Sequence, residues 1–556
     1  MSGCPPPPPP PPPAVKPKRM LTMTIQLATT EAGKRLGQNF IFFDYPDGLE
    51  VKRGRDHTTD IEVEEKSVNL FTSNEQRSLI NATNLAGLGR DYGQNFSLSW
   101  GRHFSEHYAE LRRTIQPHQS FNHLPSSQLL SHKDFLARTM LFFRNKFPKQ
   151  YNFTPQTFVL PFDLEKLRST LDAEPDSLWI EKPYASSRGR GIVIWSAQDK
   201  EKLIHKVTQP REELHPDLQN TAIKLKAPAD PAAVVIQRYL QHPCLIDGLK
   251  FDLRLYVVVT SFEPLCCYIF NEGLGRFCTT PYTPEPETVG NAFAHLTNSS
   301  VNKYSENYEK NTGSNTSSMS KGSKRSYTAV LEQLQQAGVN VQRLRESIND
   351  VIVKTLIAIS PHSRGAALQC GMHRQQGFEL YGIDVMLDSD AQPHILELNY
   401  SPDISAAMPM DRFIKGRLVA DTLNLAGIAL PPTTRDATSH LELQPRNLGL
   451  DIPDEEDMRN FLVEIEEQNV RKGLFERIFP VSAAQVRKYA DFLEPGNDFY
   501  GQDFHRLNGY VGHGDAGDRV NIASPAVVNE TRRRYEILAD LLEEQQIEAR
   551  ASATDC

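Results

Sequence analysis

The alternation of apolar and polar residues predicts that the middle of this chain consists mainly of β-strands. Between residues 178 and 400, several short runs rich in β-branched and aromatic residues are bounded by turn formers, as strands are. These runs are VVIQRYL, KFDLRLYVVVTSF, LCCYIFNEG, YGIDVML and HILELNY. An earlier segment, NFIFFDYPDGLEV at 39–51, predicts one more strand with a turn.

Apolar residues at helical spacing predict helices on both sides of these strands and between them. Two of the predicted helices cover 74–90 and 128–147, and an acidic segment beginning DIPDEEDM predicts another near the C-terminus. The stretches 197–232 and 305–326 are polar and predict an insertion and a loop. A further amphipathic helix is predicted through Leu344, Ile348, Ile352 and Ile359.

Changes in composition divide the chain into five segments. The first contains nine consecutive prolines, Pro5 to Pro13, which dictate an extended polyproline stretch. Such a stretch is either a disordered tail or a docking site for a proline-reading domain. The expected segments are a tail at 1–36, an N-terminal domain at 37–165, a core at 166–430, a linker with a helical extension at 431–510 and a polar tail at 511–556.

Charge and cysteine content narrow the class of protein. The chain has 69 acidic and 61 basic residues and a net charge of −8, which argues against a bulk nucleic-acid binder. Its seven cysteines include no CxxC pair, as expected in a reducing cytosol without disulfides or a zinc site. No run of about 18 apolar residues occurs, and the N-terminus lacks the apolar core of a signal peptide. We therefore expect a cytoplasmic monomer that binds neither nucleic acid nor membrane.

Asp384, Glu397 and Asn399 lie in YGIDVMLDSDAQPHILELNYSP, where the turn DSDAQP between two apolar runs predicts a hairpin. Pairing across this turn would bring Asp384 near Glu397, and Glu397 shares a strand face with Asn399. Two carboxylates and one amide oxygen are hard ligands that suit Mg²⁺, which completes its shell with water and substrate phosphates. The alternative is a half-buried strand with a solvated polar face.

The stretch WIEKPYASSRGRGIVIW is rich in glycine but matches neither the P-loop nor the dinucleotide pattern. Lys182 closes one strand, and Arg188 adds positive charge. Gly189 and Gly191 lack a side chain, so the backbone can approach a ligand closely. A flap of this kind can close over a triphosphate with its N–H groups and cations. The alternative is a basic hairpin turn.

The segment IQRYLQHPCLIDGLKFDLRLY supplies a third polar element. Lys250, Asp252 and Arg254 recur at every second position, on one face of an otherwise apolar strand. Burial of charged side chains without partners would cost free energy there. The alternative is an exposed sheet face. The three elements together favour a site for a nucleotide with its magnesium.

In this order, the elements resemble the ATP-grasp enzymes and, more specifically, the tubulin tyrosine ligase-like (TTLL) family. The resemblance covers about residues 95–430 and rests on KPYASSRGRGI, QRYL, GLKFDLRLYVVVTS, GLGRF, HLTNSSVNK, YGIDVMLD, ILELNYSPD and FIKGRLVADTLNLAG. FNHLPSS near 121 and ERIFP near 476 are similar to the glutamylase branch, particularly its type-four members. The resemblance implies an α+β chain. Two lobes of an ATP-grasp fold would hold ATP between their sheets, after an N-terminal α/β domain and before a helical extension.

The resemblance also implies roles for the matching residues. The phosphates would be bound by Lys182, Arg188 and Gly189, and the adenine slot would be lined by Gln237, Arg238, Tyr239 and Leu240. Lys250 and Asp252 would hold ATP from the facing strand, and Thr297 and Asn298 would complete the nucleotide site. The magnesium ligands would be Asp384, Glu397 and Asn399.

The free amino acid would be contacted by Arg276, Ser299, Ser300, Lys324 and Lys415, and the catalytic residues would be Arg254, Arg276 and Glu397. Family members commonly read HLTNYS, whereas this chain has Ser299 before Ser300. This departure puts the amino-acid preference or affinity in question. His295 of the same motif is expected to be structural rather than a base.

The reaction implied by the resemblance is the Mg-ATP-dependent ligation of L-glutamate to a glutamate γ-carboxylate in the acidic C-terminal tail of tubulin. ATP would turn the unreactive carboxylate into an acyl phosphate, which the amine then attacks to form an isopeptide bond. Positive charge at Arg276, Lys324 and Lys415 favours glutamate over glycine as the donor. The alternatives are a TTLL ligase that adds glycine or tyrosine, and a microtubule-binding pseudoenzyme.

An acidic chain binds an acidic tail only through a local positive surface. The candidates are the cations of 133–149, Arg471 with Lys472 and Arg477, and the three arginines at 532–534. The expected partners are tubulin and microtubules, and the expected location is the microtubule cytoskeleton, with a cilium or basal body as a further location.

Overall fold

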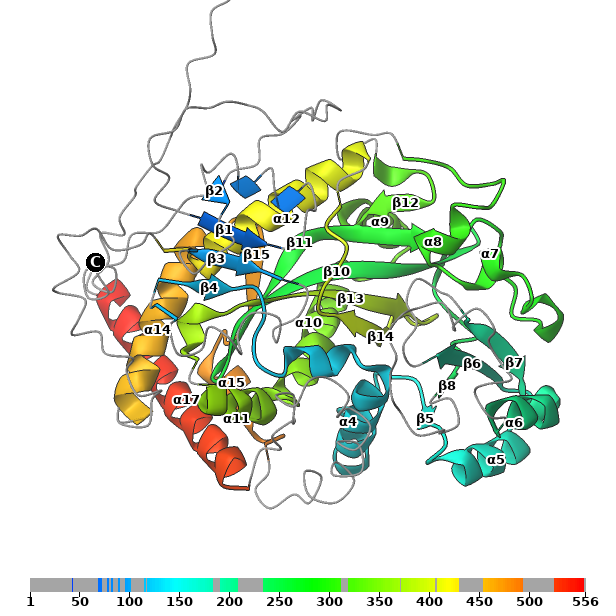
Figure 1. Cartoon of the computed structure of the whole chain (residues 1–556), viewed down its shortest axis with the longest axis horizontal. Helices are drawn as coiled ribbons and strands as arrows, with labels where there is room; N and C mark the ends of the chain where they lie inside the picture. Colours follow the sequence, from blue (N-terminus) through cyan, green and yellow to red (C-terminus); the bar gives the residue numbers. More distant parts are fainter. Residues whose placement is uncertain are drawn as a thin grey trace, which may run out of the picture.

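The computed structural model describes residue 43 and the ranges 69–72, 78–79, 82–83, 89–90, 96–101, 115–116, 118–183, 191–208, 234–311, 319–370, 372–405, 408–429, 454–493 and 525–554. Within these ranges the strands form one large central sheet and two smaller ones (Figure 1). The tail expected at 1–36 lies outside the described residues, and so does the strand expected at 39–51 apart from Phe43. None of the described helices is long and apolar enough to cross a membrane.

The central sheet has seven strands among the described residues, and its ladders are antiparallel. Its order is β12 (Lys324–Ser326), β11 (Leu265–Phe277), β10 (Leu249–Phe262), β13 (Glu379–Leu387) and β14 (Pro393–Asn399), with β9 (Leu245–Ile246) on β10 and β15 (Phe475–Phe479) on β11. Every residue of β13 is buried, and its neighbour β10 is nearly so, because helices cover the sheet. The strands predicted from KFDLRLYVVVTSF, LCCYIFNEG, YGIDVML and HILELNY are therefore confirmed.

A smaller antiparallel sheet forms a lobe at one end of the molecule, on the right in Figure 1. Its order is β5 (Thr157–Val159), β8 (Val234–Arg238), β6 (Leu178–Pro183) and β7 (Val193–Ser196), and it packs on α5 (Leu164–Ala173) and α6 (Lys200–Thr208). The helix α6 occupies the start of the predicted insertion at 197–232. It forms because Leu203, Ile204 and Val207 recur at helical spacing and are buried against the sheet.

A parallel sheet precedes this lobe in the chain. Its order is β2 (Gly89–Arg90), β1 (Asn69–Thr72), β3 (Leu98–Trp100) and β4 (Ser120–Phe121). The last two residues of the helix predicted at 74–90 therefore form a strand, and that part of the prediction is wrong. The helix predicted at 128–147 is confirmed by α4 (Lys133–Lys146), which follows the 3₁₀ turn η1 (Ser127–Ser131).

The remaining helices pack around the central sheet. They are α7 (Ala292–His295), α8 (Ser299–Asn302), α9 (Tyr327–Gln336), α10 (Val341–Ile357), α11 (Ser360–Cys370), α12 (Pro409–Ala426), α14 (Asp454–Arg471), α15 (Ala483–Ala490) and α17 (Pro525–Thr554), with 3₁₀ turns η5 (Pro286–Thr288) and η7 (Arg374–Gln376). A further 3₁₀ turn, η2 (Ala197–Asp199), belongs to the smaller lobe. The helix predicted through Leu344 and Ile352 is α10, which ends at Ile357, so Ile359 lies just beyond it.

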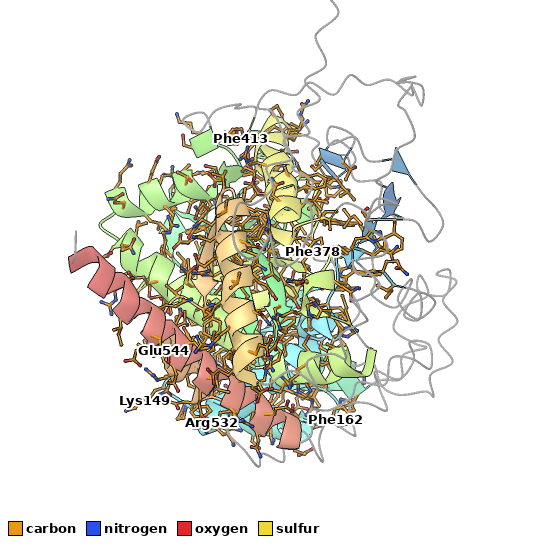
Figure 2. All side chains as sticks on the ribbon, turned by 90° about the vertical axis from the view of Figure 1, so that its left-hand side faces the viewer. Lys149, Phe162, Phe378, Phe413, Arg532 and Glu544 are labelled. Carbon is orange, nitrogen blue, oxygen red and sulfur yellow. The ribbon has the colours of Figure 1, made fainter. Side chains whose placement is uncertain are left out.

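The long helix α17 occupies much of the predicted polar tail at 511–556. Tyr535 and Leu538 of α17 are fully buried in the main core. Arg534 donates to Glu263 at 3.0 Å and to Asp457 of α14 at 2.5 Å. In Figure 2 the helix crosses α14, with Arg532 and Glu544 marking two of its turns. The described part of this segment is therefore a packed helix rather than a tail.

Candidate active site

A row of charged side chains crosses one face of the central sheet. Residues directly opposite one another in antiparallel strands share a face, and so do residues two apart in one strand. The strand register therefore places on one face Lys324 of β12, Arg276 of β11, Asp252 and Arg254 of β10, Asp384 of β13 and Glu397 of β14. The predicted pairing of Asp384 with Glu397 is confirmed by this register.

Two arginines hold the carboxylates at the centre of this row. Arg276 forms a bidentate pair with Asp252, at 2.7 and 2.5 Å, and also donates to Asp384 at 2.7 Å. Arg254 donates to the other oxygen of Asp384 at 2.5 Å. Burial disfavours the charge on Asp384, but Arg254 and Arg276 outweigh it and hold the pKa of the carboxyl below its usual value. Asp384 is therefore an anion at neutral pH.

The glycine of the YGIDVMLD motif leaves room for one of these arginines. Gly382 lies two residues before Asp384, on the same face of β13. A Cβ at Gly382 would lie 3.2 Å from the Arg254 Cδ and 2.8 Å from the Cβ of Pro402. A side chain at this position would therefore displace Arg254 from its path to Asp384.

The predicted magnesium ligands lie together at the β13–β14 end of the row. Asn399 shares a strand face with Glu397, and its side-chain amide donates to a Glu397 oxygen at 3.4 Å and to the Gly382 carbonyl at 3.3 Å. The described residues contain no cluster of three or more His, Cys, Asp or Glu side chains that could hold a metal. Two carboxylates, one of them certainly ionised, and one amide nevertheless fit Mg²⁺, because this ion takes few protein ligands.

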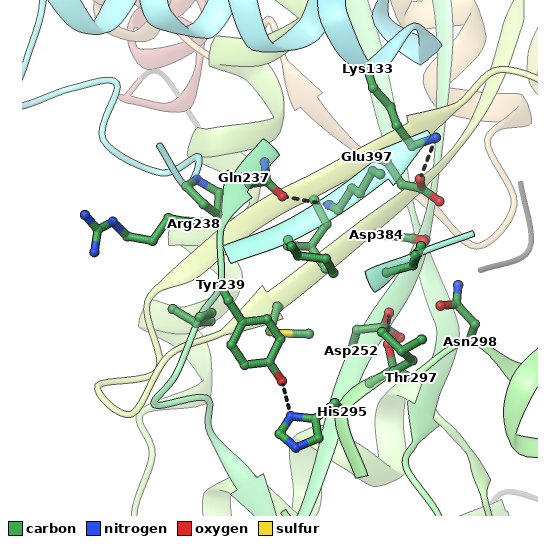
Figure 3. A pocket seen from close by; sticks show the side chains of 18 of the residues that line it. Lys133, Gln237, Arg238, Tyr239, Asp252, His295, Thr297, Asn298, Asp384 and Glu397 are labelled. Carbon is green, nitrogen blue, oxygen red and sulfur yellow. Dashed lines mark hydrogen bonds and ion pairs between the residues drawn. The ribbon is translucent and has the colours of Figure 1, made fainter. Parts of the chain in front are cut away.

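A cavity separates this row from the smaller lobe, with about 850 Å³ of empty space when the open solvent at its mouth is included. Figure 3 shows polar side chains from both sides pointing into it. Its walls include eleven of the predicted site residues: Lys182, Gln237, Arg238, Tyr239, Leu240, Lys250, Asp252, Thr297, Asn298, Asp384 and Glu397. Ile180, Ile192, Met386 and Leu396 add an apolar lining, which the motifs did not reveal.

Two lysines face this cavity whose hydrogen-bond partners among the described residues are not acidic; Lys250 is buried and Lys182 is half-buried. Lys182 of β6 donates to the side-chain oxygen of Gln237 at 2.6 Å. Lys250 of β10 donates to the Tyr239 hydroxyl at 2.7 Å. Burial lowers the pKa of each lysine to about 8. Both cations are therefore poorly neutralised in the free protein and would gain from an anionic ligand.

The predicted structural role of His295 fits its contacts. One ring nitrogen lies 2.8 Å from the Tyr239 hydroxyl (Figure 3). The other lies 3.1 Å from the Thr288 hydroxyl. Burial lowers the pKa of His295 to about 4, so the ring is neutral at pH 7. Thr297, two residues further on, donates to Asp252 at 2.7 Å.

A second group of cations lies at the β12 end of the row, outside the walls of the cavity. Lys324 and Lys415 both lie close to the carboxylate of Asp411, with distances of 3.7 and 3.3 Å. Ser299 and Ser300 form the first turn of α8 and are half-buried. The cations predicted to favour glutamate over glycine thus all have acidic partners inside the protein, which weakens that argument from charge alone.

The flap lies largely outside the described residues. This applies to Arg188 and Gly189, so their predicted contacts with phosphate stay predictions. The description resumes at Gly191, whose φ of +70° favours glycine.

Lys133 is a site residue that the sequence interpretation placed elsewhere. The sequence places it among the cations of 133–149 that are candidates for a tail-binding surface, yet it lines the cavity and its Nζ is 3.5 Å from a Glu397 carboxylate oxygen (Figure 3). Lys133 is the first residue of α4, which lies in the segment 37–165 that is expected to form the N-terminal domain. Nothing in the sequence therefore indicates that it lines the cavity.

Several other cations proposed for a tail-binding surface have partners inside the protein. Arg144 donates to the Tyr151 carbonyl at 3.2 Å, and Arg471 donates to the Asn424 carbonyl at 3.1 Å. Arg534 is only 4% exposed. Arg534 therefore does not belong to a surface for an acidic partner, and the interpretation of 532–534 as one basic patch is wrong.

A large antiparallel sheet that faces a smaller lobe across a cavity lined by lysines and carboxylates defines an ATP-grasp-like fold. A model of the tubulin-tyrosine ligase family matches residues 112–438. The chain belongs to this family.

Three relatives are similar to most of this chain, but the similarity covers only part of their own length. The chain is 35% identical over 435 residues to the human protein named tubulin monoglutamylase TTLL4, and 31% identical over 444 residues to human tubulin polyglutamylase TTLL5. It is 31% identical over 394 residues to a probable beta-tubulin polyglutamylase of Tetrahymena thermophila. These matches cover 71%, 72% and 68% of this chain, but only 33%, 32% and 30% of the relatives. The chain thus matches about a third of the length of these relatives.

Proposed function

We propose that the chain is an ATP-dependent ligase that joins L-glutamate to a glutamate γ-carboxylate in the acidic C-terminal tail of tubulin. One observation carries the proposal. A single charged row connects a cavity with two poorly neutralised lysines to a second cluster of cations, which provides for a nucleotide and an amino acid side by side. The names of the relatives, a tubulin monoglutamylase and tubulin polyglutamylases, support glutamate and tubulin as the substrates.

In this proposal ATP occupies the cavity between the two sheets. The segment from Gln237 to Leu240 lines the adenine end, and Lys182 and Lys250 bind the phosphates with Arg188 and Gly189 of the flap. Asp384, Glu397 and Asn399 would hold Mg²⁺, which when bound neutralises phosphate charge and aligns the transferred group. Lys133 would restrain Glu397 from the opposite side.

The amino acid would bind beside the nucleotide, at Arg276, Lys324 and Lys415, with Ser299 and Ser300 at the edge of its site. Arg276 is suited to a catalytic role because it links Asp252 on the nucleotide side with Asp384 on the magnesium side. Arg254 keeps Asp384 charged and in place, and Glu397 completes the proposed catalytic set.

The chemistry requires an activated carboxylate. Transfer of the γ-phosphoryl group from ATP to the acceptor γ-carboxylate gives an acyl phosphate and ADP. The amine of glutamate then attacks the carbonyl carbon, the amide forms and phosphate leaves. The fixed cations of the row stabilise the charge that develops in both steps, and the two sheets exclude the water that would hydrolyse the intermediate.

The substrate claim is tested with purified chain, polymerised tubulin and Mg-ATP, with labelled glutamate, glycine or tyrosine offered separately. We expect incorporation of glutamate only, into the C-terminal tails, with tubulin lacking these tails as a negative control. Incorporation of glycine or tyrosine instead would replace the donor in the proposal. Microtubule binding without incorporation of any amino acid would indicate a pseudoenzyme.

The partners and location follow from this function and are proposed with it. Microtubules in the cytoplasm are the expected site of action, with the cilium or basal body as a further location. The chain would act as a monomer, and the polyproline run at 5–13 would be either a disordered tail or a docking site for a proline-reading domain. Lys149, which is exposed at the end of the 133–149 segment, is available for an acidic tail.

A further inference from the structure

We propose that Asp411 is a positioning residue of the amino-acid site: its one buried carboxylate holds Lys324 and Lys415 together, next to Arg276, where the incoming amino acid binds. This inference rests on the proposed function for the location of the amino acid. Asp411 matches none of the roles assigned above.

The geometry brings two cations from separate parts of the fold to one carboxylate. Asp411 lies in the first turn of α12 and is 4% exposed. Its Oδ2 is 3.7 Å from the Nζ of Lys324 in β12, and its Oδ1 is 3.3 Å from the Nζ of Lys415, one helical turn later. Lys324 is directly opposite Arg276 in the sheet. Asp411 thus places one negative charge between the two lysines, while Lys415 also donates to the Ser405 carbonyl at 3.0 Å.

Without a carboxylate, this arrangement of cations would be unstable. The side chains of Arg276 and Lys415 are 10% and 5% exposed, and that of Lys324 is 22% exposed. Within the described ranges, Asp411 is the one carboxylate within 4 Å of both lysines. Asp403 lies 3.9 Å from Lys415, but its side chain is 67% exposed, so solvent screens it.

The charge state of the lysines depends on the same carboxylate. Burial lowers the pKa of Lys324, and Asp411 is the largest influence that raises it, while Lys415 and Arg276 lower it and Asp403 raises it. Burial also opposes the charge on Lys415, but Tyr256, Asp411 and Asp403 outweigh it and raise the pKa. Removal of the charge on Asp411 therefore lowers both lysine pKa values, and an uncharged lysine no longer attracts the carboxylates of an amino acid.

The effect should be confined to the amino acid, because Asp411 does not line the nucleotide cavity. We would measure by calorimetry the binding of L-glutamate to chain saturated with a non-hydrolysable ATP analogue, and separately the binding of the analogue. For Asp411→Asn we expect glutamate affinity to fall at least about tenfold at pH 7.5, with the affinity for the analogue changed less than about twofold. The pH at which glutamate binding is lost should also move to a lower value.

Two further variants separate positioning from folding. Asp411→Glu keeps the charge and should restore at least half of the lost binding free energy. Asp403→Asn removes an exposed carboxylate beside the same lysine and should change glutamate affinity less than about threefold. Thermal unfolding of each variant shows whether it folds.

The proposal is overturned if Asp411→Asn weakens nucleotide and glutamate equally, or leaves the pH dependence of glutamate binding unchanged. It also fails if the folded wild-type chain binds no glutamate. These outcomes differ from failure of the proposed function, which appears as an absence of incorporation into tubulin. A chain that binds glutamate through Asp411 but modifies no tubulin would keep this inference and lose the tubulin assignment.

Discussion

Lysines occur on both the proposed nucleotide side and the proposed amino-acid side of the charged row, but their surroundings differ. On the nucleotide side, Lys182 and Lys250 donate to an amide oxygen and a hydroxyl. On the amino-acid side, Lys324 and Lys415 lie against the carboxylate of Asp411. A lysine whose hydrogen-bond partners are uncharged attracts a polyphosphate with its full positive charge. A lysine already paired with a carboxylate attracts a small anion weakly and serves to orient it.

The largest expected effects concern the acidic centre of the row. Glu397→Gln should reduce incorporation more than about a hundredfold and change the free energy of unfolding by less than about 1 kcal/mol, because the side chain is 29% exposed. Asp384→Asn should abolish activity and also destabilise the fold by about 3 kcal/mol, since it leaves the buried Arg276 and the half-buried Arg254 short of a partner. Activity assays and denaturant titrations check both. Full activity in Glu397→Gln would refute the metal assignment.

The second prediction compares the two kinds of lysine directly. Lys415→Met should destabilise the chain by about 3 kcal/mol, because Asp411 stays buried and loses its nearer cation. Lys182→Met should leave stability unchanged or higher, because it removes a half-buried charge whose hydrogen-bond partner among the described residues is a neutral amide. The same variant should weaken ATP binding at least about tenfold. Equal destabilisation by the two variants would show that the lysine environments do not differ as described.

The third prediction concerns pH. Burial lowers the pKa of Lys182 and Lys250 from 10.5 to about 8 in the folded chain. Above pH 8 the unfolded chain therefore binds more protons than the folded one, so these lysines make stability rise between about pH 8 and 10.5. ATP affinity should move in the opposite direction and fall about tenfold between pH 7 and 9, because neutral lysines attract phosphate poorly. Thermal unfolding and nucleotide titrations over this range test the two trends. Lys182→Met should reduce the rise of stability with pH.

The smallest effect is expected at Ser299, where related motifs commonly have tyrosine. Ser299→Tyr adds an aromatic surface at the half-buried start of α8. We expect the KM for glutamate to change by less than about threefold and the KM for ATP to stay the same. A change in the preferred amino acid, measured with the three labelled donors, would instead make this position a determinant of specificity.

The parts of the site that lie on adjacent strands could be predicted from the sequence. The turn between β13 and β14 is short and the side chains alternate, so the pairing of Asp384 with Glu397 follows from local rules. The charges on β10 were a further signal, since three ionisable side chains on one face of an apolar strand need partners. The bidentate contact of Arg276 with Asp252 supplies one.

Residues brought in by helices could not be predicted in the same way. Asp411 and Lys415 are both buried in α12, a helix buried over most of its circumference, so no polar face marks them. Lys133 resembles any charged residue at the start of a helix until the position of α4 against the sheet is known. The helix α17 was taken for a tail because its many charges suggest solvent, whereas Arg534 is neutralised by carboxylates from distant segments.

The ladder between β11 and β15 bears on how this chain can be shortened. Residues Phe475–Phe479 complete an edge of the central sheet, although they follow the end of the family match at residue 438. A fragment that stops at that boundary would expose the backbone N–H and C=O groups of β11 and the apolar surface beneath α17, and would invite aggregation. The minimal unit for expression therefore extends past the family boundary and includes α17 at least to Leu542, its last buried residue among those described.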